Sequence, residues 1–102
     1  MTMAEELRIE TFENRVGEVF RLVVPGETEL VLRLSEVTPL SPATSPPGSP
    51  RSPFTVLFHG PPTPWVSQAT HRLEHGGLGP LELFLVPLGP DAAGMRYEAV
   101  FT

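Results

Sequence analysis

The last quarter of this 102-residue chain alternates apolar side chains with other residues at every second position. Successive side chains of a β-strand point to opposite sides, so a period of two predicts strands with one buried face. The pattern therefore predicts an all-β fold, and it carries little information about chemistry. The alternating apolar residues are Leu81, Leu83 and Leu85 in one run and Met95, Tyr97, Ala99 and Phe101 in the next.

Similar alternation runs through most of the chain, interrupted by turn dipeptides such as Pro25-Gly26. Proline and glycine supply the backbone angles that tight turns need. Burying one face of every strand requires a sheet rolled on itself or two packed sheets. We therefore expect a six-stranded antiparallel meander forming a small barrel or a barrel-like sandwich. The expected strands are Glu18–Val24, Thr28–Val37, Pro53–His59, Ala69–His75, Leu81–Val86 and Met95–Thr102.

Two segments lie outside this strand pattern. Residues 7–16 have the features of a single helical turn capped by Thr11, with Ile9, Phe12 and Val16 as apolar contacts. Residues 38–53 are rich in proline and serine, have no apolar period and are expected to form a long loop. The length of the chain fits one β domain spanning residues 1–102.

Charge and composition exclude several classes of partner. The net charge is −5 and the seven arginines are dispersed, whereas nucleic-acid binding needs a concentrated cationic surface. The apolar runs fall short of the roughly 20 residues that a membrane-spanning helix needs. The N-terminus lacks the cationic and apolar regions of an export signal, which leaves the compartment open. We expect neither nucleic-acid binding nor membrane insertion.

No catalytic, cofactor-binding or metal-ligating residues are predicted. The chain contains no nucleophile-elbow motif of the Gly-x-Ser-x-Gly type and no cysteine. His71 and His75 lie on one predicted strand, about 13 Å apart and too far to share a metal ion. Glu74 and Glu82 form a possible carboxylate pair, but Arg72 beside them favours ordinary charge pairing.

Two features are candidates for binding a protein partner. The last strand carries no proline or lysine to protect an edge, so a partner strand can add there, which nominates Met95, Tyr97 and Phe101. Trp65 follows several prolines and is either a plug that closes one end of the barrel or an anchor for a partner. We favour the plug and keep Trp65 among the partner-binding candidates.

Three blocks carry a resemblance to a known family: LRIETFENRVGEVFRL, PFTVLFHGPP and HRLEHGGLGPLELFLVPLGPDAAGMRYEAVF. They resemble a family of small bacterial proteins described only as a domain of unknown function. The resemblance implies that such proteins are companions of phage-tail-collar and tail-fibre-like proteins in bacterial genomes. It supplies no activity or catalytic residues. Residues 38–53 lie outside it.

The leading hypothesis is a non-enzymatic structural or assembly domain. It binds other chains or itself through an exposed strand edge and the proline-rich loops, with tail-fibre-like or filament subunits as one class of partner. The alternative is a small-ligand-binding β-barrel that uses an interior cavity or the mouth near Trp65 and His59. A metal-dependent enzyme is the third hypothesis.

Overall fold

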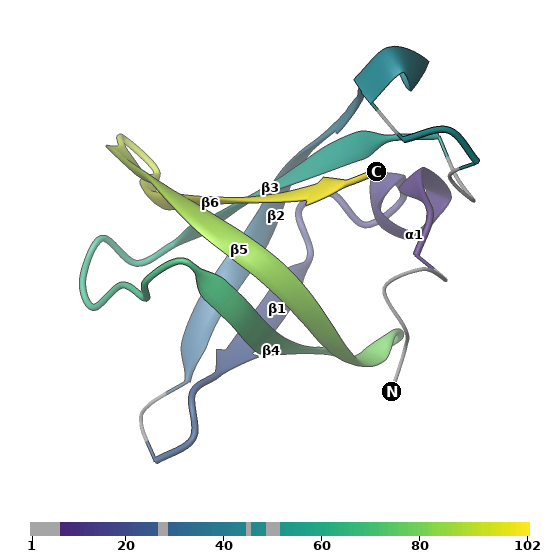
Figure 1. Ribbon diagram of the computed structural model, residues 1–102. Helices are drawn as coiled ribbons and strands as arrows, with labels where there is room; N and C mark the ends of the chain where they lie inside the picture. Colours follow the sequence, from purple (N-terminus) through teal and green to yellow (C-terminus); the bar gives the residue numbers. More distant parts are fainter. Residues whose placement is uncertain (1–6, 27–28, 45, 49–51) are drawn as a thin grey trace.

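The computed structural model describes residues 7–26, 29–44, 46–48 and 52–102, and it is built mainly of β-strands (Figure 1). Six strands occur where six were expected, which confirms the predicted all-β class. The Pro25-Gly26 turn follows the first strand, with Gly26 at a φ of 77°. The elements are α1 (Ile9–Glu13), β1 (Val19–Val23), β2 (Leu30–Pro39), the short 3-10 helix η2 (Pro42–Thr44), β3 (Phe54–Gly60), β4 (Ala69–His75), β5 (Gly79–Asp91) and β6 (Gly94–Phe101).

The strands close into an antiparallel barrel with the order β1-β2-β3-β6-β5-β4. β1-β2-β3 and β4-β5-β6 are two three-stranded units, and closure comes from the β3–β6 and β1–β4 pairs. The return of β4 to the side of β1 is a Greek-key connection. The expected barrel is confirmed, but the expected simple meander is wrong because β3 and β4, although consecutive, do not pair.

β6 is flanked by β3 and, over most of its length, also by β5. It pairs with β3 along Phe54–Gly60 and with β5 along Val86–Asp91. The predicted exposed edge at the last strand is therefore wrong for Gly94–Glu98, while the register gives the last three strand residues partners on β3 only. In a closed barrel every strand has two neighbours, so β6 offers no full-length free edge for strand addition.

The barrel interior is filled by the side chains that the period of two had selected. Leu81, Leu83 and Leu85 of β5 are buried, and so are Phe54, Val56 and Phe58 of β3. The described residues include no buried polar or charged side chain. Packed apolar side chains thus occupy the space in which a ligand-binding barrel would need a cavity.

The short helix α1 closes one end of the barrel. Phe12 is fully buried, with its ring centroid 6.4 Å from that of Phe20, 6.1 Å from Phe54 and 5.5 Å from Phe101. Arg8 N–H donates to Thr11 Oγ1 at 3.0 Å, which satisfies one backbone donor at the start of the helix. Phe12 is therefore the residue that plugs the barrel.

Several boundaries differ from the expected ones. Val16, expected among the apolar contacts of the first turn, is half exposed. β2 continues into the expected loop, because Thr38 and Pro39 pair with β3. β5 runs on through Pro87, where the register with β6 shifts between Pro87 and Gly89. Such an irregularity accommodates a proline that cannot donate to the ladder.

Candidate functional site

The four residues nominated for partner binding lie in different environments. Met95, Tyr97 and Phe101 point into the barrel and are buried, so they are not available on the surface as an edge-binding set. This follows from the period of two, because every second side chain of a strand points to the same face and the apolar residues of β6 all occupy the face that lines the barrel interior. Trp65 alone remains on the surface, with 53% of its area exposed. An indole so exposed does not close the barrel, so the plug hypothesis for Trp65 is wrong.

Trp65 lies in the loop that joins β3 to β4, residues 61–68. Pro61, Pro62 and Pro64 precede it, and prolines restrict the backbone conformations of this segment. The next residue, Val66, packs against the core and donates its backbone N–H to the buried Tyr97 Oη at 3.1 Å. The loop is thus tied to the barrel immediately beside Trp65.

A groove of about 420 Å³ lies next to the Trp65 ring. Three prolines contribute to it, together with Met95, which is 6% exposed. We call it the Trp65 groove; its lining is Pro62, Trp65, Pro87, Gly89, Pro90 and Met95.

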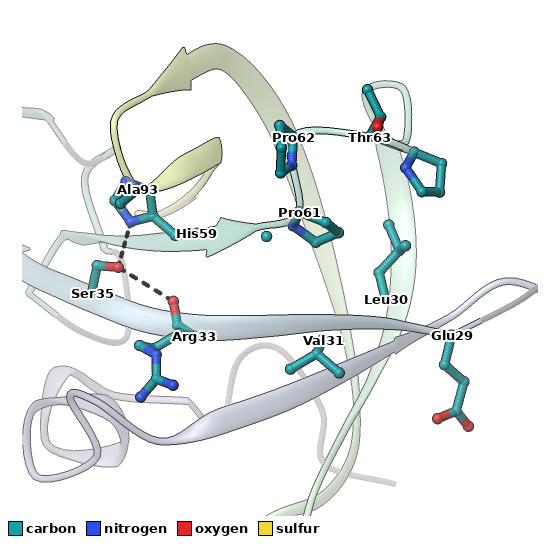
Figure 2. Close-up of a pocket in the computed structure, with 12 residues that line it drawn as sticks. Glu29, Leu30, Val31, Arg33, Ser35, His59, Pro61, Pro62, Thr63 and Ala93 are labelled. Carbon is teal, nitrogen blue, oxygen red and sulfur yellow. Dashed lines mark hydrogen bonds between the residues drawn. The ribbon is translucent and has the colours of Figure 1, made fainter.

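A second and larger groove, of about 730 Å³, shares Pro62 with the first (Figure 2). Its wall combines apolar side chains of β2 and the β3–β4 loop with five polar or charged ones, which are Glu29, Arg33, Ser35, His59 and Thr63. We call it the Ser35 groove; it is lined by Leu30, Val31, Ser35, His59, Pro61 and Pro64 among others.

Ser35, His59 and Asp91 form a chain of hydrogen bonds at this groove. Ser35 Oγ lies 2.5 Å from His59 Nδ1, and His59 Nε2 lies 2.9 and 3.1 Å from the two carboxylate oxygens of Asp91. The His59 side chain is 15% exposed and that of Asp91 is 44% exposed. Sequence reasoning missed this arrangement, because the three residues lie on β2, β3 and the end of β5.

The proton positions follow from the charge of Asp91. The hydrogen bond from His59, followed by that from the Ala93 backbone N–H at 2.8 Å, lowers the pKa of Asp91 below its usual 3.8. An ionised carboxylate only accepts, so His59 donates Nε2–H to it, and in the tautomer that carries its proton on Nε2 the Nδ1 atom accepts from the Ser35 hydroxyl. We assign this tautomer from the hydrogen-bond network.

The other two histidines make hydrogen bonds within the barrel wall and its adjoining turns. His75 Nε2 lies 2.6 Å from a Glu18 carboxylate oxygen, while its Nδ1 accepts the backbone N–H groups of Gly77 and Leu78 in the turn that follows β4. His71 Nε2 donates to the Ser67 carbonyl oxygen at 2.8 Å. Across the part of the chain that the structure describes, no three acidic or imidazole side chains gather as a metal site would require.

The carboxylate pair considered at β4 and β5 is an ordinary charged surface. Glu74 accepts from Arg21 at 3.2 Å and from Arg72 at 3.4 Å. Arg72 stands opposite Glu82 in the register of the two strands. The predicted pairing of Glu74 with arginine is confirmed, and exposed pairs of this kind contribute little to stability.

Tyr97 gives the fold a defined sensitivity to alkaline pH. Burial raises its pKa above the usual 10.0, although the hydrogen bond from Val66 N–H acts in the opposite direction. The folded state thus retains the phenol proton more tightly than the unfolded state. The free energy of unfolding is therefore expected to fall as pH rises through about 10, where the unfolded phenol ionises.

This alkaline response is testable because the chain has one tyrosine, no lysine and no cysteine. We expect Tyr97→Phe to cost about 1 kcal/mol at neutral pH through the lost hydrogen bond, and to remove most of the decline above pH 9. Urea unfolding at several pH values, followed by circular dichroism, measures both effects. An equal decline in the variant and the parent protein would contradict the assignment to Tyr97.

The chain folds into a small closed β-barrel domain whose surface carries the adjoining Trp65 and Ser35 grooves. The chain belongs to the family described as a domain of unknown function, DUF6916, whose model matches residues 7–101. Membership of a family of unknown function is thereby confirmed. No curated protein and no solved structure matches the chain. No helix of the described residues has the length and apolar character to cross a membrane.

Proposed function

We propose that this domain binds extended, proline-rich protein segments in the Trp65 groove. The observation that carries the proposal is a half-exposed tryptophan on a loop that the Val66–Tyr97 hydrogen bond ties to the core. The partner-binding role expected from the sequence is retained, and its location moves from a strand edge to this face. With the barrel closed, side chains rather than a free strand carry the recognition.

The chemistry of the groove favours this class of partner. Polyproline segments dock against aromatic side chains because their extended helix is preformed and loses little entropy on binding. Trp65 offers a flat ring, and Pro62, Pro87 and Pro90 make the adjoining surface apolar. Proline restricts the loop before the partner arrives, which lowers the entropic cost of association.

A segment of suitable chemistry occurs in the chain itself. Residues 38–53 contain the PxxP spacings Pro47 to Pro50 and Pro50 to Pro53. A second copy can thus supply the ligand, which is the self-association form of the proposal. The resemblance to companions of bacterial phage-tail-collar and tail-fibre-like proteins supplies the other form, in which a tail-fibre-like or filament subunit provides the segment. Both forms use the Trp65 groove, and neither requires a cofactor.

Trp65 is the single tryptophan of the chain, so its fluorescence reports on the groove directly. We expect a peptide of residues 40–53 to shift the emission of Trp65 in a saturable manner. The same peptide with its prolines replaced by alanine should bind at least about tenfold more weakly, because a flexible ligand loses more entropy on binding.

Two variants test the location by isothermal titration calorimetry. Trp65→Ala is expected to abolish peptide binding, because aromatic anchors dominate such interfaces. Phe84→Ala is the matched control, because Phe84 is 52% exposed and lies on β5 outside the groove lining. Removing this side chain should leave peptide binding unchanged. Equal affinity of Trp65→Ala and the parent protein, or no affinity for the peptide at all, would contradict the proposal. Light scattering then separates self-association from binding to another chain.

A further inference from the structure

We propose that Ser35 is a nucleophile, activated by His59 as general base and oriented through Asp91, and that it accepts acyl groups from esters with small apolar acyl chains. This goes beyond the proposed binding function and adds a reaction at the neighbouring groove. The expectation of a non-enzymatic domain depended on the lack of a local motif, whereas these three residues meet only in the folded barrel.

The geometry satisfies the requirements for an activated serine. A nucleophile and a base should lie within hydrogen-bond reach, with a third group orienting the base. Ser35 Oγ and His59 Nδ1 are 2.5 Å apart, and Asp91 holds the opposite ring nitrogen at 2.9 Å. Such sites are recognised by geometry and roles rather than by position in the sequence. Here Nδ1 faces the serine and Nε2 faces the carboxylate.

Local backbone structure explains how Ser35 reaches the imidazole. The register of β2 against β3 pairs Leu34 with Phe58 and then Glu36 with Leu57, so Ser35 is the extra residue of a β-bulge. Bulges redirect side chains and are frequent beside active sites. His59, the partner of Arg33 in the same ladder, is thereby brought within reach of Ser35 Oγ.

The hydroxyl group has one competing acceptor. Ser35 Oγ lies 3.4 Å from the Arg33 carbonyl oxygen, and Figure 2 draws this contact together with the one to His59. The 2.5 Å separation from His59 Nδ1 is within hydrogen-bond distance, whereas 3.4 Å is beyond the usual range for a hydroxyl donor. The Ser35 proton is therefore directed at His59 Nδ1, which is the direction of transfer that attack requires.

The walls of the groove select the acyl group. Ser35 and His59 share the groove with Leu30, Val31, Pro61 and Pro64, so an apolar chain can lie along these four side chains (Figure 2). Glu29 and Arg33 make other parts of the wall charged. Asp91 is outside the lining and stands behind the imidazole, where it positions the base without meeting the substrate. It is thus a positioning residue.

The reaction balances without a further reagent. As Ser35 Oγ attacks the ester carbonyl carbon, its proton passes to His59 Nδ1. The bond from the carbonyl carbon to the alcohol oxygen then breaks, and the alcohol leaves with that proton. Water attacks the acyl-Ser35 ester in the same manner, with His59 again taking the proton, and returns it to Ser35 as the carboxylic acid is released.

The test uses p-nitrophenyl butyrate and the intact domain. We expect a burst of p-nitrophenol, a mass increase of one butyryl group, and that group on Ser35 after peptide mapping. Ser35→Ala should lose the adduct completely, whereas Ser67→Ala, which removes an exposed serine of the β3–β4 loop, should react as the parent does. His59→Gln should slow acylation about 100-fold.

The role of Asp91 is tested by two replacements. Asp91→Asn should slow acylation at least about tenfold because the ring loses its orienting charge, and Asp91→Glu should restore part of the rate. Melting followed by circular dichroism confirms that each variant is folded. An unmodified parent protein, or an adduct that persists in folded Ser35→Ala, would overturn the proposal. Trp65→Ala should still be acylated, so failure here is distinct from failure of peptide binding.

Discussion

Replacing Phe12 by alanine is expected to lower the free energy of unfolding by about 3–5 kcal/mol, the range for truncating a fully buried phenylalanine. Phe12 has no exposed surface, and its ring meets Phe20, Phe54 and Phe101 at the end of the barrel. These three rings come from β1, β3 and β6, so the cavity left by the substitution would open between strands far apart in sequence.

The matched comparison is Trp65→Ala, which removes a larger side chain from a half-exposed position on the surface. We expect that change to cost less than about 1 kcal/mol, because a half-exposed ring loses little burial. Urea unfolding of both variants gives the two free energies and also the slopes, which report whether the barrel stays two-state. An equal loss of unfolding free energy in the two variants would mean that Phe12 of α1 does not close the end of the barrel.

The reversal of roles between Phe12 and Trp65 shows a limit of sequence reasoning. Trp65 is conspicuous because three prolines closely precede it, and the sequence favours a large aromatic residue between strands as a plug. Phe12 lies in a helix of five residues, too short for a helical period to reveal which face is buried. The end that α1 covers is decided by contacts with β1, β3 and β6, and those contacts are non-local.

Strand existence was predictable, while strand pairing was only partly so. The period of two identified Leu81, Leu83 and Leu85 as a buried row, and it placed β4 at its observed bounds. Turn residues predict pairs between consecutive strands, such as β4 with β5. The pairs β1–β4 and β3–β6 join strands that no short turn connects, so turn residues and local periodicity do not predict them. The error about the β6 edge has the same origin.

The chain of hydrogen bonds at the Ser35 groove could not be read from the sequence for a related reason. His59 is separated by 24 residues from Ser35 and by 32 from Asp91. Their approach depends on the bulge in β2 and on the extension of β5 beyond Pro87. Neither irregularity carries a sequence signal as strong as the turn dipeptides. Barrel closure and two local register shifts therefore create the site.

Gly94→Ala is expected to destabilise the barrel by about 3 kcal/mol, the upper end of the range for changes that force a backbone shift in a packed site. Gly94 has a φ of 125°, where a side chain is strained, and an added Cβ would overlap the carbonyl oxygen of Gly60. Backbone cannot move aside as a flexible side chain can. The clash would push β3 away from β6 beside His59 and Asp91, so we also expect slower acylation of Ser35.

Gly26→Ala separates the strain of positive φ from the steric overlap. Gly26 has a φ of 77°, and none of the described residues places an atom within 4 Å of an added Cβ, so its substitution should cost only about 1 kcal/mol for the backbone conformation. The difference between the two variants in thermal or urea unfolding then measures the contact between Gly94 and the Gly60 carbonyl. Equal costs would show that β3 and β6 approach less closely there than the barrel requires, and they would weaken the placement of His59 against Asp91.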